Sequence, residues 1–178
     1  MATLMVTGHR QIVPEGHTGN LWPDSNPVVF QHHQLLTQHL TYICYELFLQ
    51  GYTNFISGYA LGADQLFAES VIELKRLSYP VRLVAAVPFK SQCSNWPQKS
   101  QIKYRELLGK ADEVVIVSPG EYSSAKMQKR NEWMVDRADL VLAVWNGAQS
   151  GGTFNCVKYA LGQGKKIIKF HPEKLVAY

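Results

Sequence analysis

Three glycine-bearing turns, each following a short apolar run, are the parts of this sequence best suited to bind a ligand. In a parallel sheet such turns gather at the carboxyl edge of the strands, where open α/β folds bind their ligands. Because glycine has no Cβ, a phosphate can approach its backbone closely, and a helix start offers free N–H groups and about half a positive charge. These features predict a site for a phosphorylated small molecule. The turns are Thr7-Gly8-His9-Arg10, Ser57-Gly58-Tyr59-Ala60-Leu61-Gly62-Ala63-Asp64, and Gly147 with Ser150-Gly151-Gly152-Thr153.

The third turn is the best candidate for holding a phosphate group. Gly151 and Gly152 can expose successive backbone amides, and Thr153 adds a hydroxyl at the start of a helix. The alternative is an ordinary tight connection between a strand and a helix.

The first turn places two polar side chains directly after Gly8. His9 and Arg10 can reach a phosphate or a ribose, and the arginine can do so through a bidentate fork. In the alternative, Arg10 pairs with a carboxylate and His9 caps a turn. The dinucleotide pattern GxGxxG is absent, which argues against an ordinary NAD-dependent dehydrogenase.

The second turn forms another candidate phosphate cradle through Ser57, Gly58 and Gly62. Asp64 stands at the start of the following helix. Its carboxylate can cap helix N–H groups or contact a ribose hydroxyl, and both interpretations stay open.

These turns need strands and helices to position them, and the chain alternates between the two. Apolar spacing predicts a single Rossmann-like α/β domain over residues 1–178, with a mostly parallel sheet and helices on both faces. A long loop is expected over 11–29, around Trp22. The expected strands are 2–6, 54–57, 81–87, 113–117, 140–145 and 166–170, the last closing the sheet, and the expected helices are 30–50, 62–78, 97–110, 126–137 and 152–162.

Composition limits the class of protein. Hydrophobic residues make up 46% and charged residues 18% of the 178, as in globular chains. The 18 basic and 14 acidic residues leave a net charge of +4, so a nucleic-acid partner is not expected. No apolar run reaches the roughly 18 residues of a membrane span, and no leader is recognised. Cys44, Cys93 and Cys156 are odd in number and lack metal-binding spacing, which indicates a reduced, cytoplasmic protein without a metal site. No cofactor is expected.

Taken in order, the motifs resemble the YpsA family of the SLOG superfamily from about residue 4 to 170. That superfamily includes the Lonely Guy phosphoribohydrolases, DprA-like DNA-binding proteins and sensor domains for NAD-derived signals. The resemblance implies a Rossmann-like fold that binds nucleotides or nucleotide-derived ligands, and with the aromatic residues it favours a homodimer or larger assembly. It extends the ligand-binding set to Pro88, Phe89, Asn131, Gly147 and Asn155. Besides the three turns, the matching pieces are Pro88-Phe89, Trp96, Tyr104, Ala111-Asp112 and Arg130-Asn131-Glu132-Trp133-Met134-Val135-Asp136.

Arg130 matches an arginine of the Lonely Guy helix motif that contacts substrate in that family. We therefore expect Arg130 to face the ligand; the alternative is a surface ion pair with Glu132 or Asp136. The chain departs from the enzyme pattern after the third turn, where Asn155 and Cys156 replace acidic residues. N-glycosidic cleavage calls for a nearby carboxylate.

Binding, for sensing or sequestration, of a nucleotide such as an ADP-ribose-like or cyclic nucleotide signal is therefore favoured over hydrolysis. A nucleoside 5'-monophosphate phosphoribohydrolase is the alternative.

Overall fold

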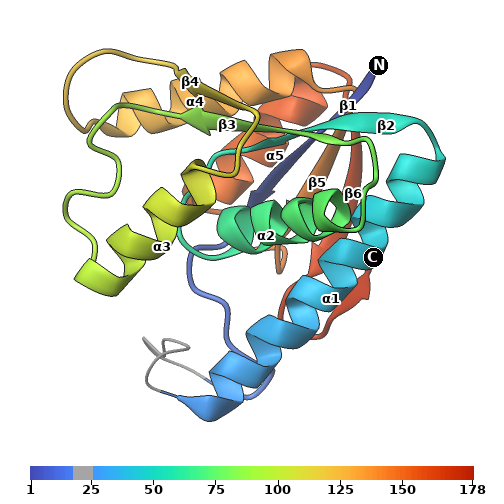
Figure 1. Ribbon diagram of the computed structural model, residues 1–178. Helices are drawn as coiled ribbons and strands as arrows, with labels where there is room; N and C mark the ends of the chain where they lie inside the picture. The colour runs from blue at the N-terminus through green and yellow to red at the C-terminus, as the bar shows by residue number, and fades with distance from the viewer. Residues whose placement is uncertain (18–25) are drawn as a thin grey trace.

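A computed structural model describes residues 1–17 and 26–178, so the predicted loop around Trp22 lies partly outside the described residues. The described chain forms one seven-stranded sheet with helices on both sides (Figure 1). The predicted α/β fold is confirmed. The elements are β1 Ala2–Gly8, α1 Pro27–Leu49, β2 Tyr52–Ser57, α2 Ala63–Arg76, β3 Arg82–Val87, α3 Gln98–Leu108, β4 Glu113–Ile116, α4 Ser124–Arg137, β5 Leu140–Val144, α5 Gly151–Gly162, β6 Lys166–His171 and β7 Val176–Ala177.

The sheet follows the order β4-β3-β2-β1-β5-β6-β7. Strands β1 to β6 pair in parallel, whereas β7 pairs antiparallel to β6. The prediction that residues 166–170 close the sheet is therefore wrong, because β7 adds a further edge strand. A strand of only two residues is too short to leave a periodic pattern in the sequence.

The first helix begins earlier than its apolar spacing suggested. The side-chain oxygen of Asn26 accepts hydrogen bonds from the N–H groups of Val28 and Val29, at 2.9 and 3.2 Å, and Pro27 occupies the first turn. Asparagine as N-cap followed by proline is a strong helix start, since proline lacks the N–H that would be left unpaired there. The predicted loop over 11–29 is thus too long by three residues.

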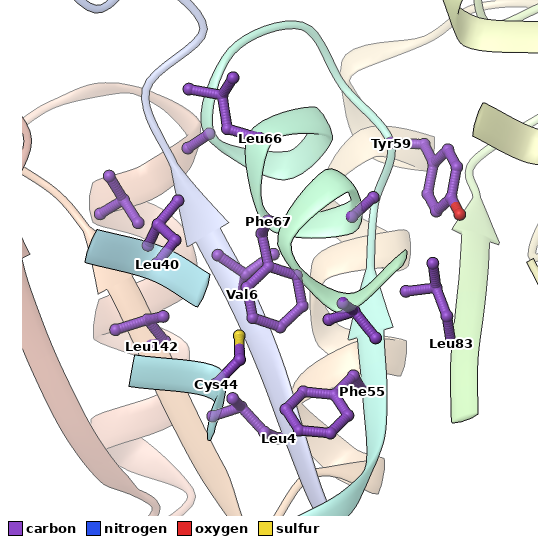
Figure 2. Packing of buried hydrophobic residues seen from close by; sticks show 14 of the residues in the cluster. Leu4, Val6, Leu40, Cys44, Phe55, Tyr59, Leu66, Phe67, Leu83 and Leu142 are labelled. Atoms are coloured by element: carbon purple, nitrogen blue, oxygen red, sulfur yellow. The ribbon is translucent and has the colours of Figure 1, made fainter. Parts of the chain in front are cut away.

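Alternate residues of β1 face two different cores. Leu4 and Val6 pack with α1 and α2, whereas Met5 packs with α4 and α5. Figure 2 shows the first core, where Phe67 of α2 lies over β1 beside Phe55 of β2. Each such apolar side chain contributes about 1.5–3 kcal/mol on burial. The two cores hold the sheet rigidly and so position the turns at its edge.

The strand order reverses direction at β1, which lies between β2 and β5. The helices α1, α2 and α3 cover one face and α4 and α5 the other. In open α/β sheets the crevice for a ligand opens at such a switch point, at the carboxyl ends of the strands. The turns after β1, β2 and β5 all end there. Among the described residues, no helix is both long and apolar enough to cross a membrane.

Candidate functional site

The turn after β1 is packed tightly against its neighbours. A Cβ added to Gly8 would lie 2.4 Å from Cβ of Ala63 and 2.8 Å from the carbonyl oxygen of Val144. Gly8 therefore lets β1, β5 and the start of α2 approach one another. Nε2 of His9 lies 2.8 Å from the side-chain oxygen of Asn146 and 3.3 Å from its backbone nitrogen, which ties the turns after β1 and β5 together. Arg10 is exposed.

In the turn after β2, backbone and side-chain groups of the protein occupy the space that a ligand would need. Gly62 has φ of +83°, and a Cβ there would lie 2.3 Å from the carbonyl oxygen of Arg10. The hydroxyl of Ser57 donates to the carbonyl oxygen of Asp64 at 2.7 Å. Oδ2 of Asp64 accepts from the N–H of Ala60 at 3.3 Å. The first turn of α2 thus already contains an acidic group, which disfavours an external anion there, and the N–H of Ala63 donates to the carbonyl oxygen of His9.

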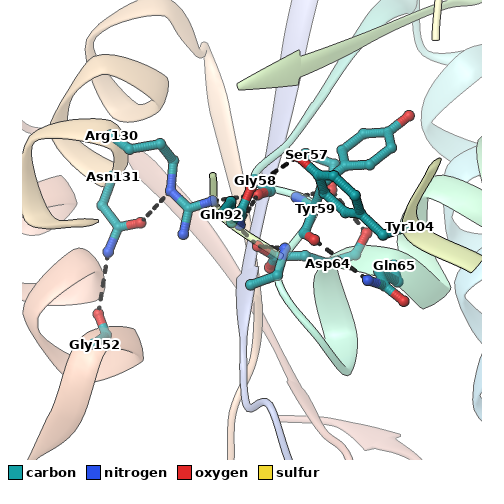
Figure 3. A network of polar contacts seen from close by, with 11 residues as sticks. Ser57, Gly58, Tyr59, Asp64, Gln65, Gln92, Tyr104, Arg130, Asn131 and Gly152 are labelled. Carbon is teal, nitrogen blue, oxygen red and sulfur yellow. Dashed lines mark hydrogen bonds and ion pairs between the residues drawn. The ribbon is translucent and has the colours of Figure 1, made fainter. Parts of the chain in front are cut away.

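Arg130 of α4 lies at the centre of a buried polar network (Figure 3). Its Nη1 donates to the carbonyl oxygen of Gly58 and lies 3.6 Å from Oδ2 of Asp64. Its Nε donates to Oδ1 of Asn131 at 3.0 Å. A Cβ at Gly58 would lie 1.7 Å from Nη1 of Arg130, so that glycine is what admits the guanidinium. The alternative of a surface ion pair with Glu132 or Asp136 is wrong.

Burial sets the electrostatics of this pair. Arg130 is 5% and Asp64 6% exposed. Loss of solvation raises the pKa of Asp64, and the nearby Arg130 charge opposes that rise only in part. The same desolvation lowers the pKa of Arg130, although a guanidinium stays protonated in proteins.

The turn before α5 is open, in contrast with the other two. Cβ atoms added to Gly151 and Gly152 would meet nothing within 4 Å. The N-cap residue Ser150 makes no side-chain capping bond, and the first turn of α5 contains no acidic residue. Nδ2 of Asn131 donates to the carbonyl oxygen of Gly152 at 3.5 Å, so Figure 3 shows Arg130 connected to this turn through Asn131. The first N–H groups of α5 are therefore available to an anion.

Two flanking residues shape this open turn. Gly147 has φ of +87°, a left-handed conformation in which a side chain is strained. Thr153 is 8% exposed and lies one residue beyond Gly152 on the inner side of α5. The ligand-binding roles of Gly147, Gly151, Gly152 and Thr153 stay predictions.

The positions that would be acidic in the enzyme pattern point in different directions. Asn155 is exposed on the outer side of α5, away from the network. Cys156 is fully buried, and its loss of solvation raises the pKa of the thiol to about 11, with the Thr7 hydroxyl bonded to it acting in the opposite sense. A neutral thiol beside Arg130 supplies no general base at neutral pH.

Beyond β3, the structure adds a residue that sequence reasoning missed. Phe89 is buried and packs edge-on to Tyr122, and the carbonyl oxygen of Pro88 accepts from the N–H of Ser118. Gln92, on the same turn, donates through Nε2 to the carbonyl oxygen of Gly58 at 3.1 Å. Tyr104 donates to Oε1 of Gln92 at 3.3 Å. A lone glutamine outside any spaced motif gave no signal in the sequence.

The network brings together six of the predicted residues by direct contacts. They are Ser57, Gly58, Asp64, Arg130, Asn131 and Gly152. A groove of about 1380 Å³ lies between α1 and α2, is also lined by residues of α3, and borders the site at Arg10, Gly62 and Gln65. Within the described residues, no three His, Cys, Asp or Glu side chains gather to hold a metal ion. The groups that the site offers are N–H donors and a guanidinium, which suit an anion.

The fold and this site define a Rossmann-like α/β protein with an uncapped, open helix start at its switch point. The YspA SLOG family, YpsA, matches residues 4–171. The chain belongs to this family, which confirms the resemblance seen in its motifs.

Curated relatives agree with the family. The SPbeta prophage-derived protein YoqJ of Bacillus subtilis is 38% identical over 133 residues, which cover 67% of this chain and 77% of YoqJ. A UPF0398 protein of Shouchella clausii is 28% identical over 117 residues, 65% of this chain and 62% of that protein. The chain therefore spans less than two thirds of some of the relatives it matches.

Two solved structures share the fold. DNA processing protein A from Streptococcus pneumoniae matches with a TM-score of 0.63 at 13% identity, over 96% of this chain and 50% of that one. DNA processing protein A from Helicobacter pylori, whose structure describes a single-stranded DNA binding mode, matches with a TM-score of 0.61 at 16% identity, over 96% and 65%. The expectation against a nucleic-acid partner is therefore wrong. A net charge of +4 does not exclude such a partner, because local placement of charge matters more than the sum.

Proposed function

We propose that the carboxyl edge of the sheet binds a nucleotide or nucleotide-derived ligand, such as an ADP-ribose-like or cyclic nucleotide, with a phosphate at the first turn of α5. The observation that carries the proposal is the open turn at Gly151 and Gly152, whose amides are neither capped by Ser150 nor faced by an acid of their own helix. Backbone N–H groups at a helix start are a general phosphate site. In this proposal residues 1–178 act as one cytoplasmic binding domain.

Arg130 supports the same placement. Its guanidinium is fixed by the carbonyl oxygen of Gly58 and by Asn131, which itself contacts the turn at Gly152. A buried cation fixed by such contacts, here together with the Asp64 carboxylate at 3.6 Å, is preorganised, so little side-chain entropy is lost when an anion binds. Thr153, His9 and Arg10 complete the proposed phosphate and ribose contacts.

Binding without turnover is favoured by the side chains around the turn. Cleavage of an N-glycosidic bond needs a carboxylate near the sugar. Asn155 faces solvent, Cys156 is a buried neutral thiol, and Asp64 is engaged by Ala60 and Arg130. The ligand would accordingly be sensed or sequestered.

The direct test combines a binding assay with an activity assay. Purified protein would be titrated with adenosine 5'-monophosphate, cyclic adenosine monophosphate and ADP-ribose in a calorimeter, and the mixtures with the monophosphate analysed by chromatography for free adenine. Saturable binding without release of base is expected. Rapid release of adenine would instead establish the phosphoribohydrolase activity, and absence of binding to all three would contradict the proposal.

Single-stranded nucleic acid is a second candidate for the same edge, favoured by the likeness to a protein that binds single-stranded DNA. A strand would place one of its phosphates at the open turn of α5. Binding of an oligonucleotide would weaken steeply as salt rises, because each neutralised phosphate releases counterions, whereas a mononucleotide depends on salt far less. Competition between a labelled oligonucleotide and ADP-ribose separates the two candidates, since a shared site requires displacement.

A further inference from the structure

A stripe of exposed apolar side chains runs along the outer surface of α1. Val28, Leu35, Tyr42 and Leu49 follow one another at intervals of seven residues and are between 41% and 62% exposed. The opposite side of α1 packs on the sheet through other residues, so this helix has two apolar faces. Figure 1 shows α1 along the outside of the molecule beside α2. A repeat of seven is the spacing with which one helix packs lengthwise against another.

This face is almost free of charge. Glu46 is the one charged side chain among the 23 residues of α1, and it accepts a hydrogen bond from the hydroxyl of Tyr42. Between the apolar residues lie the amides of Gln31 and Gln38. Nucleic acid and anionic membranes both select lysine and arginine, which this helix lacks. Depletion of charge is instead the mark of the centre of a protein–protein interface.

The surface beside the stripe is concave. The groove of about 1380 Å³ is lined by Gln38, Tyr42 and Tyr45 of α1 and by Leu66 and Leu74 of α2. Its charged lining residues, Arg10, Glu69, Glu73, Lys99 and Lys103, all lie outside α1. A groove between two helices, edged by a stripe of apolar side chains, has the shape that receives a third helix.

We propose that the occupant is α1 of a second copy of this chain, packed antiparallel about a two-fold axis near Gln38 and His39. Each copy brings the same seven-residue stripe, and an uncharged face complements itself, whereas selection of a different partner normally uses charge pairs. The antiparallel direction sets Val28 opposite the partner's Leu49 and Leu35 opposite the partner's Tyr42. It also separates the two Glu46 carboxylates, which a parallel pair would bring together.

Sedimentation analysis of the wild type and two matched variants tests the interface. Leu35→Glu introduces a charge at a position already exposed in the single chain, so folding should be retained, as circular dichroism would verify. We expect the wild type to be dimeric and L35E to raise the dimer dissociation constant roughly a hundredfold or more, as for an unpaired charge in an apolar interface. Leu161→Glu, on the exposed surface of α5, serves as the control and should stay dimeric.

Disulfide trapping tests the direction of packing. Cys44, Cys93 and Cys156 are buried and will not compete in the folded protein. Gln38→Cys, near the axis, should form a covalent dimer under mild oxidation, whereas Val28→Cys should do so only when Leu49→Cys is also present. A monomeric wild type, or a dimer unaffected by L35E, would overturn the proposal. Efficient trapping by V28C alone would overturn the antiparallel arrangement.

Discussion

The starts of α2 and α5 lie at the same edge of the sheet and both contain glycine, as the N-cap Gly62 of α2 and as Gly151 and Gly152 of α5, but they differ in what occupies them. At α2, a Cβ on Gly62 would strike the backbone of Arg10, and Asp64 accepts the N–H of Ala60. At α5, Cβ atoms on Gly151 and Gly152 would meet nothing, and no acid faces the amides from within the first turn. Glycines that look alike in the sequence therefore have different roles: one set lets the protein approach itself, and the other leaves space for a ligand.

Arg130 contacts the turn before α2 directly and the turn before α5 through Asn131. Nη1 reaches the turn before α2 at Gly58, and Nε reaches Asn131, which donates to Gly152 at the start of α5. The packed turn thus holds the cation in place, and the open turn is where we propose that the anion binds. Substitutions in the packed turn should therefore lower the stability of the fold, whereas substitutions in the open turn should lower affinity for the ligand.

The largest expected effect on stability is that of Gly62→Ala. The positive φ of +83° strains any side chain, and the added Cβ would lie 2.3 Å from a backbone oxygen that cannot swing away. We expect a loss of about 3 kcal/mol in the free energy of unfolding. Urea denaturation measures it, with Gly162→Ala in the open last turn of α5 as the control. A loss below about 1 kcal/mol would show that the turn before α2 is not closely packed.

Arg130→Ala should weaken binding of ADP-ribose by about 1.5–3 kcal/mol, the range for a hydrogen bond to a charged group. Arg137→Ala, on the same helix but exposed and stacked on Trp133, should change it by less than about 0.5 kcal/mol. Calorimetric titration of both variants gives the comparison. If both substitutions weakened binding equally, Arg130 would not be a contact of the ligand.

A smaller, pH-dependent effect is expected from Asp64. Burial raises its pKa in the folded state, so the folded protein retains the proton while the unfolded chain has already lost it. The stability of the wild type relative to Asp64→Asn should therefore fall as pH rises through the raised pKa, by about 1.4 kcal/mol for each tenfold difference in proton affinity between the folded and unfolded states. Urea denaturation of both proteins between about pH 4 and pH 7 measures this difference. A wild type that gains relative stability over this range would mean that pairing with Arg130 outweighs desolvation.

The sequence was sufficient to predict the α/β alternation and the gathering of the three turns at one edge, because apolar periodicity and glycine placement are local signals. The partners of Arg130 were not predictable, since Gly58 and Asp64 lie far from it in the chain and only the fold brings them together. The contribution of Gln92 was missed for the same reason. The packed and the open glycines could not be told apart either, because the distinction depends on which distant backbone lies opposite each Cα.

The nucleic-acid prediction failed for a different reason. It rested on net charge, a sum over the whole surface, whereas recognition of a phosphate depends on a few groups at one place. The open turn of α5 and the buried Arg130, where we propose that a phosphate binds, add little to the total charge.

The central claim, that the open turn of α5 receives the ligand's phosphate, is tested most directly by Gly152→Val with Gly162→Val as its matched control. Both positions lie in α5 with nothing within 4 Å of the added Cβ. The free energy of unfolding of each variant should therefore lie within about 0.5 kcal/mol of the wild-type value. In calorimetric titrations with ADP-ribose, we expect G152V to lose binding, because its side chain blocks approach to the amides, and G162V to bind like the wild type. A folded G152V protein that binds ADP-ribose with unchanged affinity would contradict the claim.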